Sequence, residues 1–182
     1  MDNLKEIQLS SERLYKGRIL DLYLDEVQLA DGKTSKREYI KHLGAACVVP
    51  VDNDNNVIMV KQFRYPFSRV LSEVPAGKLD SAAESHLVTA KRELLEETGY
   101  VAENMIYLGE YYPTCAYSDE VIHMYLATGL RYEEQKLDEG EFIGVEKIPL
   151  DAVVEEIMKG NIRDGKTQTA ILKAYYYLKN NK

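Results

Sequence analysis

The chain has 182 residues, which suits one domain with at most a small appendage. Hydrophobic residues make up 45% of the sequence and charged residues 29%, a composition that is ordinary for a globular protein with a real core. The formal net charge of -7 argues against a nucleic-acid-binding protein, which needs a basic surface. An anionic small-molecule substrate remains compatible with this charge, because a few arginines and a metal ion set the local field.

The two cysteines, Cys47 and Cys115, lack the paired spacing of a disulfide framework or a zinc site. We therefore expect free thiols in a reducing compartment. The sequence has no signal-like start and no long apolar run, which argues against secretion and membrane insertion. These features predict a cytoplasmic protein.

The N-terminal part of the chain is polar and contains short alternating segments. Residues 20–27 and 36–41 alternate apolar and polar side chains around a turn at 30–32, which predicts an antiparallel hairpin. We expect residues 1–43 to form a small antiparallel β-subdomain and residues 44–182 to form the main domain.

The main domain is predicted to mix strands and helices. The apolar runs at 45–51 and 57–62 flank a turn-rich stretch and predict two buried strands that form a hairpin. Two further strands and two helices are predicted at 121–127, 141–145, 151–158 and 166–178, respectively. Mixed elements of this kind give an α/β or α+β domain.

A further helix is predicted between Ser85 and Gly99, because no glycine or proline interrupts this stretch. Ser85 suits the N-cap of a helix, and Gly99 suits the position just after its C-terminus. The expected buried stripe consists of Leu87, Val88, Leu94 and Leu95.

Three glutamates crowd the C-terminal half of this helix. Glu93 and Glu97 are four residues apart and lie side by side next to the apolar stripe. Such acids often form only a solvated face, because like charges at this spacing cost about 0.2–0.5 kcal/mol when exposed. Here both the helix dipole and the apolar edge disfavour anions, and a bound Mg²⁺ or Mn²⁺ ion would remove both penalties.

The segment at 75–78, Pro-Ala-Gly-Lys, predicts a tight loop that leads toward this helix. Gly77 would allow the backbone to approach a metal ion, and a backbone carbonyl of the loop is a candidate for a further ligand.

Together these residues resemble the box of the Nudix hydrolase family. The box consists of a glycine, five residues, a glutamate, seven residues, and a run of Arg-Glu-apolar-any-Glu-Glu-any-Gly ending in an apolar or aromatic residue. The matching positions are Gly77, Glu84 and residues 92–100. Six residues instead of five separate Gly77 from Glu84, so the extra residue falls in the loop and leaves the helix register intact.

The resemblance covers most of the chain and is closest to the ADP-ribose pyrophosphatase branch. Similar segments lie at 37–38, 60–64, 72–80, 112–113, 118–120 and 162–167. At 113–117 the chain reads Pro-Thr-Cys-Ala-Tyr, where many members carry a loop like Ser-Pro-Gly that faces the substrate.

This resemblance implies a Nudix α/β/α sandwich with a small N-terminal antiparallel β-subdomain. It further implies a swapped-type homodimer, in which the N-terminal subdomain serves dimerisation and substrate contacts. The implied reaction is the Mg²⁺-dependent hydrolysis of the pyrophosphate bond of ADP-ribose to AMP and ribose 5-phosphate, with Mn²⁺ as a substitute ion.

The resemblance also assigns roles to residues. The metal ligands are the carbonyl of Ala76 and the carboxylates of Glu93, Glu97 and Glu141. Glu96 helps to bind metal or to hold the helix, and Arg92 is favoured as an orienting ion-pair partner over a role as a phosphate ligand. The general base is expected on the loop at 138–141, with Glu139 preferred over Glu141.

Five residues are candidates for substrate contacts, namely Tyr15, Arg37, Arg64, Glu73 and Pro113. A planar guanidinium suits phosphate oxygens, so the two arginines are candidates for phosphate or ribose contacts. The aromatic ring of Tyr15 is a candidate for stacking on adenine, and Glu73 and Pro113 belong to segments that resemble the branch.

Two alternatives remain open. The catalytic glutamates do not separate ADP-ribose from another nucleotide sugar or dinucleotide, such as GDP-mannose or NADH, because specificity lies in the loops and in the dimer partner. A non-catalytic ligand sensor on the same fold is the second alternative, although such proteins often lose box glutamates that this chain retains.

Overall fold

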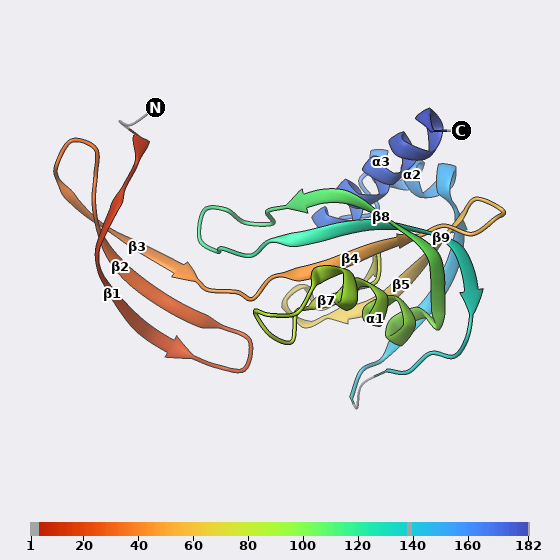
Figure 1. Cartoon of the computed structure of the whole chain (residues 1–182), viewed down its shortest axis with the longest axis horizontal. Helices are drawn as coiled ribbons and strands as arrows, with labels where there is room; N and C mark the ends of the chain where they lie inside the picture. Colours follow the sequence, from red (N-terminus) through yellow and green to blue (C-terminus); the bar gives the residue numbers. More distant parts are fainter. Residues whose placement is uncertain (1–3, 138–139, 182) are drawn as a thin grey trace. The chain divides into compact units, whose positions relative to one another are not determined.

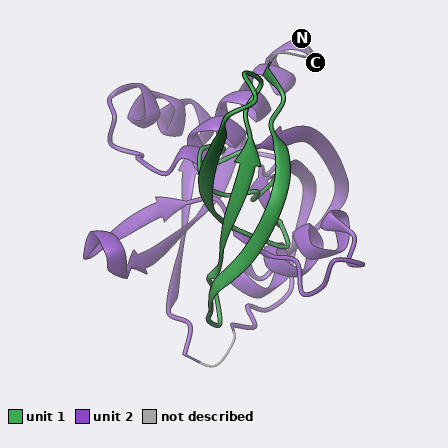
Figure 2. Cartoon of the chain, turned by 90° about the vertical axis from the view of Figure 1, so that its left-hand side faces the viewer, with its two compact units in different colours: residues 1–44, 112–121 green, residues 45–111, 122–182 purple. Residues whose placement is uncertain are grey.

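The computed structural model describes residues 4–137 and 140–181. The chain divides into two compact units, which Figure 2 shows in different colours. Unit 1 comprises Met1–Gly44 and Tyr112–Val121, and unit 2 comprises Ala45–Tyr111 and Ile122–Lys182.

Unit 1 contains a three-stranded antiparallel sheet in the order β1-β2-β3. The strands are β1 (Ile7–Lys16), β2 (Asp21–Gln28) and β3 (Thr34–Ile40). The predicted hairpin is confirmed as β2 and β3. The sequence pattern does not predict β1, because register shifts between Gln8 and Ser10 and between Arg13 and Tyr15 interrupt its alternation.

The segment Tyr112–Val121 belongs to unit 1 because backbone hydrogen bonds join it to the end of β3. The amide of Ile40 donates to the carbonyl of Tyr117 at 2.9 Å, and the amide of Asp119 donates to the carbonyl of Ile40 at 3.2 Å. The amide of His42 also donates to the Asp119 carboxylate at 2.7 Å.

Within the described residues, unit 2 contains two sheets. One sheet has the order β7-β4-β9-β8, with β4 (Ala45–Pro50), β7 (Ala76–Lys78), β8 (Tyr100–Tyr111) and β9 (Ile122–Tyr132). The other sheet has the order β10-β5-β6, with β5 (Asn56–Arg64), β6 (Arg69–Glu73) and β10 (Ile143–Pro149). The pair β4–β9 is parallel, and the other pairs of both sheets are antiparallel.

Three helices of unit 2 flank these sheets, namely α1 (His86–Thr98), α2 (Leu150–Met158) and α3 (Gly165–Asn180). The central strand β4 is buried on both faces. Cys47 and Val49 pack into a core that includes side chains of α2 and α3, whereas Ala46 and Val48 pack against α1. The sheet therefore lies between helices on both sides, as Figure 1 shows, and the predicted α/β/α arrangement is confirmed. Across the described part of the chain, no helix is long and apolar enough to cross a membrane.

The predicted hairpin of the strands at 45–51 and 57–62 is wrong. These segments form β4 and β5, which belong to different sheets and share only an isolated bridge between Val51 and Val57. An apolar run indicates that a strand is buried, but it does not indicate which strand it pairs with. β4 pairs with β9, which lies far along the chain. The other predicted strands and helices are confirmed as β9, β10, α2 and α3, while β6, β7 and β8 fall outside the predicted elements.

The predicted ends of α1 are confirmed. The Ser85 side chain accepts a hydrogen bond from the amide of Leu87, and Gly99 adopts the left-handed conformation with φ 75°. The predicted stripe is partly wrong, because Val88 is 56% exposed. The buried residues of α1 are Thr89, Ala90, Glu93, Leu94, Glu97 and Thr98. The two glutamates thus lie on the buried face of the helix itself.

Gly99 is the position where the end of α1 depends most on the absence of a side chain. A Cβ there would lie 2.8 Å from the Gln135 amide nitrogen and 2.8 Å from the Tyr132 ring, in addition to the strain of the positive φ. We expect Gly99→Ala to lower the free energy of unfolding by at least about 1 kcal/mol, measured by chemical denaturation.

Gly144→Ala is the matched control, because a Cβ at Gly144 would make only an ordinary contact of 3.7 Å with Lys61. Equal losses of stability in the two variants would contradict this account of the helix end.

Candidate functional site

Two buried carboxylates define the candidate site. Glu93 and Glu97 on α1 are 9% and 7% exposed. Burial, with a smaller contribution from the negative charge of Glu141, raises the pKa of Glu93 to about 7 and the pKa of Glu97 to about 8. The environment of the two side chains therefore disfavours their charged form.

The backbone of β7 lies directly against these carboxylates. The amide of Ala76 donates a hydrogen bond to Glu97 Oε2 at 3.1 Å. A Cβ on Gly77 would lie 1.8 Å from Glu93 Oε1, so any side chain there would displace the Glu93 carboxylate. Pairing with β4 places Ala76 and Gly77 opposite Cys47 and Ala46. The segment at 75–78 is therefore not the predicted tight loop, because Ala76–Lys78 pairs with β4 as strand β7. Its backbone and the acids of α1 nevertheless converge, as the spacing of the box predicts.

Arg92 connects the acids of the box through ion pairs. Its Nη1 donates to Glu93 at 2.7 Å and to Glu96 at 3.0 Å, and its Nη2 donates to the Lys78 carbonyl at 3.0 Å. Its Nε also lies 3.8 Å from Glu84. Arg92 therefore ties α1 to the loop that follows β7, which is the geometry of an orienting ion-pair partner.

A divalent cation fits the chemistry of this donor set. Buried carboxylates with raised pKa values need a counter-charge, and carboxylate and carbonyl oxygens are the ligands that Mg²⁺ and Mn²⁺ prefer. Among the residues that the structure describes, no three His, Cys, Asp or Glu side chains form a ready metal cage. Arg92 binds Glu93, and Glu141 is an exposed residue of the loop before β10.

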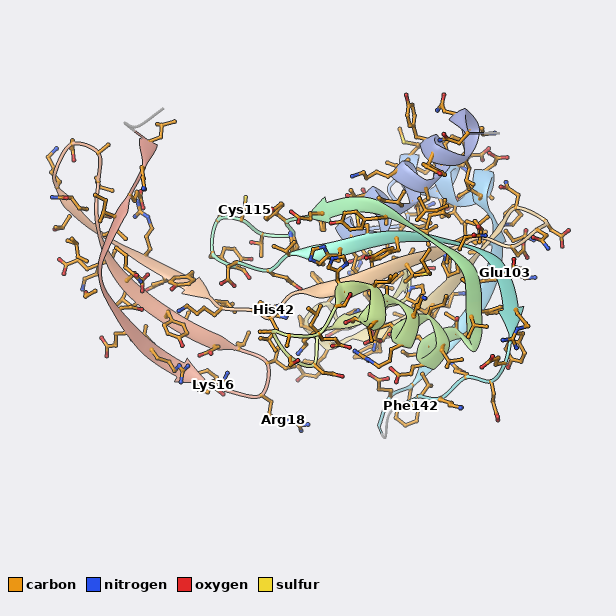
Figure 3. All side chains as sticks on the ribbon, viewed as in Figure 1. Lys16, Arg18, His42, Glu103, Cys115 and Phe142 are labelled. Carbon is orange, nitrogen blue, oxygen red and sulfur yellow. The ribbon has the colours of Figure 1, made fainter. Side chains whose placement is uncertain are left out.

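The loop between β9 and β10 carries the two remaining acids of the predicted set. Glu141 is exposed, and its charge acts on both Glu93 and Glu97. Its neighbour Phe142, labelled in Figure 3, is 87% exposed. Glu139 lies outside the described residues, so its role as the base stays a prediction.

Glu73, a candidate for substrate contact, is only 2% exposed. Nε and Nη2 of Arg64 each donate to one of its carboxylate oxygens at 2.7 Å. The ammonium of Lys166 also pairs with Glu73 and lies 2.9 Å from Asp164. Burial alone raises the pKa of Glu73, but Arg64 and Lys166 lower it below its ordinary value. Both oxygens of Glu73 are thus occupied by cations of the protein, while part of the Arg64 side chain remains exposed.

The other three candidates for substrate contact lie in unit 1. Tyr15 is an exposed residue of β1, and Pro113 is half-buried in the segment after β8. Arg37 on β3 donates to Glu6 at 2.9 Å and to Ser35 at 3.0 Å. The contacts of these three residues with a substrate stay predictions.

Residues 162–167 resemble the branch in sequence, but that resemblance predicts no role for Asp164, Lys166 and Thr167 at the start of α3. One local signal was available, because Asp164 is a favourable N-cap and accepts a hydrogen bond from the amide of Thr167 at 2.9 Å. No local pattern, however, indicates that Lys166 reaches Glu73, which is 93 residues away in the chain.

Comparisons with known families agree with this geometry. The model of the NUDIX domain matches residues 41–168. The model of the nucleoside diphosphate sugar hydrolase N-terminal domain matches residues 6–40.

Known relatives span nearly the whole chain. It is 40% identical to the ADP-ribose pyrophosphatase of Bacillus subtilis (strain 168) over 173 residues, which cover 94% of this chain and 93% of the relative. It is also 40% identical to the methanol dehydrogenase activator of Bacillus methanolicus over 169 residues, or 92% and 91% of the two chains. A crystal structure of an ADP compounds hydrolase shares the fold with a TM-score of 0.84 at 20% identity, covering 97% of this chain and 95% of the other. The chain therefore belongs to the Nudix hydrolase family, whose members generally use a divalent metal ion.

Proposed function

We propose that the protein hydrolyses the pyrophosphate bond of ADP-ribose. Water adds across one P–O bond of the diphosphate, and the products are AMP and ribose 5-phosphate. The observation that carries this proposal is the pair of buried glutamates, Glu93 and Glu97, held against the glycine backbone of β7. The name of the relative from Bacillus subtilis, which this chain matches over nearly its whole length, supports the choice of substrate.

The proposed ion is Mg²⁺, with Mn²⁺ as a substitute. Its ligands in this proposal are the Ala76 carbonyl and the carboxylates of Glu93, Glu97 and Glu141. When bound, such an ion neutralises charge on the diphosphate and lowers the pKa of the attacking water.

The remaining roles belong to side chains of the protein. In this proposal Arg92 holds Glu93 and Glu96 in place, and Glu139 accepts the proton of the attacking water. The exposed part of Arg64 and the guanidinium of Arg37 contact phosphate or ribose oxygens. Tyr15 and Pro113 complete the proposed set of substrate contacts.

A nucleotide sugar other than ADP-ribose is the alternative candidate for the substrate. The match of residues 6–40 to the N-terminal domain of nucleoside diphosphate sugar hydrolases favours this wider class, which includes GDP-mannose. The box glutamates act on the diphosphate and are common to both candidates, so only a direct comparison of substrates separates them.

We also propose a homodimer that acts in the cytoplasm. All ten residues of β1 are exposed, including Ile7, Leu9 and Tyr15, which are each more than half exposed. β1 is an edge strand of its sheet, and apolar side chains on an exposed edge favour pairing with another chain. The free thiol of the exposed Cys115 suits a reducing compartment.

The pKa values of Glu93 and Glu97 predict how the stability of the metal-free protein depends on pH. Both pKa values, about 7 and about 8, exceed the ordinary value of 4.5. Between pH 4.5 and these raised values, the folded state therefore binds more protons than the unfolded state. The stabilising contribution is fully present below pH 4.5 and is lost as the pH rises through 7 and 8. We expect the melting temperature without metal to fall from about pH 6 to about pH 8.5, and Mg²⁺ to reverse the fall.

Glu97→Gln is the control for this titration, because it keeps the shape of the side chain and removes the charge. The variant should show a smaller fall with pH and a smaller effect of Mg²⁺ in the same thermal scans. A wild-type response to Mg²⁺ in both Glu93→Gln and Glu97→Gln would exclude these residues as ligands.

The substrate proposal predicts the outcome of a panel assay with Mg²⁺. ADP-ribose should give a higher kcat/KM than GDP-mannose or NADH, with equimolar AMP and ribose 5-phosphate as its products by chromatography. The absence of AMP release from ADP-ribose would contradict the proposal, and faster turnover of GDP-mannose would assign the enzyme to that sugar instead.

The two loop acids should differ in their kinetic effects. Glu139→Gln is expected to lower kcat by about 10²–10⁴-fold without changing the Mg²⁺ concentration for half-maximal rate, because it removes only the base. Glu141→Gln should instead raise that Mg²⁺ concentration. If Glu141→Gln lowers kcat and Glu139→Gln raises the Mg²⁺ concentration for half-maximal rate, the roles of Glu139 and Glu141 are exchanged.

The dimer proposal predicts a mass of twice 20.8 kDa by size-exclusion chromatography with light scattering. Leu9→Lys should shift the protein toward the monomer, because a charge on the apolar edge of β1 disfavours its burial. Met158→Lys, which changes an exposed apolar residue of α2, should leave the mass unchanged. A monomeric wild-type protein would overturn the proposal.

A further inference from the structure

The four residues at 73–76, which run from the end of β6 to the start of β7, are held by β4, β5, α1 and α3 of unit 2. Arg64 and Lys166 bind the carboxylate of Glu73. The amide of Val48 on β4 donates to the carbonyl of Pro75 at 2.9 Å. The last of the four residues, Ala76, carries the proposed carbonyl ligand, so whatever fixes this segment also fixes that carbonyl.

The start of α3 supplies the contact in the middle of the segment. The amide of Val74 donates to Thr167 Oγ1 at 3.0 Å, and the Thr167 hydroxyl lies 2.6 Å from Asp164 Oδ2. A hydroxyl has one proton and the carboxylate can only accept, so Thr167 donates to Asp164 and keeps its lone pairs for Val74. The hydrogen bonds therefore run in one direction, from the Val74 amide to Thr167 and from Thr167 to Asp164.

Lys166 gives the second contact from the same turn of helix. Its ammonium bridges Glu73 and Asp164. Burial lowers the pKa of Lys166, but Asp164 and Glu73 raise it above its ordinary value, so the side chain is charged. With Arg64, the group contains two cations and two anions, which is the balance that a buried charged network requires.

The far end of the segment meets the candidate metal site. The amide of Ala76 donates to Glu97 Oε2 at 3.1 Å, so a shift of the segment would move both the carbonyl of Ala76 and the partner of Glu97. Thr167 is fully buried and its bond to Val74 is only two residues before Ala76. A displacement at α3 is thus passed to the metal ligands over a very short length of backbone.

We propose that Asp164, Lys166 and Thr167 are positioning residues that set the Ala76 carbonyl and Glu97 for the divalent ion. The inference rests on the proposed metal-dependent hydrolysis, but it concerns metal binding before any nucleotide is present. Residues that orient metal ligands in this way typically contribute 10–100-fold in metal affinity.

The test is a titration of the full-length, nucleotide-free protein with Mn²⁺, followed by the electron paramagnetic resonance signal of the free ion. Thr167→Val removes the hydroxyl and keeps the shape, and we expect it to raise the Kd for Mn²⁺ by about 10-fold or more. Thr167→Ser restores the hydroxyl and should return the Kd close to the wild-type value.

Thr169→Val is the matched control on the same helix. Its hydroxyl donates only within the helix, to the carbonyl of Gly165 at 2.9 Å. The control should keep the wild-type Kd, and a thermal scan of each variant measures any loss of stability separately from the loss of affinity. If Thr167→Val does not fold, the Kd of the Lys166→Met variant for Mn²⁺ tests the positioning role instead.

The outcomes separate this inference from the proposed function. A wild-type Kd in folded Thr167→Val, or no Mn²⁺ binding by the wild-type chain, would overturn the positioning role. If Thr167→Val weakens Mn²⁺ binding while the wild-type protein releases no AMP from ADP-ribose, the positioning role stands and the proposed substrate falls.

Discussion

The burial of two carboxylates against a glycine backbone is the constraint on which the rest of unit 2 depends. Removing an anion from water costs several kcal/mol, so Glu93 and Glu97 stay on the buried face of α1 only because stronger packing holds the helix there. Ala90 and Leu94 supply this packing against β4. Because β4 also pairs with β7, the same strand fixes the helix and the backbone of Gly77 at which the acids point. Either a proton or a cation would relieve this charge penalty.

The parts of the fold that the sequence predicts well are those decided by neighbours in the chain. Ser85 and Gly99 end α1 through local hydrogen bonds and local backbone geometry, so their residue types were sufficient. The buried face of α1 was less predictable. Ala90 packs against β4, whereas Val88, a larger apolar residue that the helical pattern places in the buried stripe, is exposed. Strand pairing failed for a different reason, because β4 and β5 are consecutive in sequence but find their partners in separate sheets.

In the candidate site, too, contacts between neighbours in the chain are predictable and contacts between distant residues are not. The spacing of the box brings Gly77, Glu93 and Glu97 together, and this follows from helix geometry and one short connection. The partners of Glu73 do not follow from any spacing, because Lys166 lies 93 residues further along the chain. A glutamate beside the box has the same local pattern whether it faces a ligand or a lysine of the same chain, so only the tertiary structure distinguishes the two.

A comparison of Glu73 and Glu97 shows how the structure makes this distinction in physical terms. Both are glutamates with little exposed surface, and burial by itself raises the pKa of each. The pKa of Glu73 nevertheless falls below its ordinary value, because Arg64 and Lys166 bind its oxygens. The pKa of Glu97 rises to about 8, because burial and the charges of Glu93 and Glu141 outweigh the hydrogen bond from the Ala76 amide, which lowers it. The charged form of Glu73 is thus stabilised by cations of the chain, whereas the charged form of Glu97 is disfavoured unless a further cation is present. The sign of the pKa shift, rather than the burial, therefore distinguishes Glu73, which is paired within the chain, from Glu97, the proposed metal ligand.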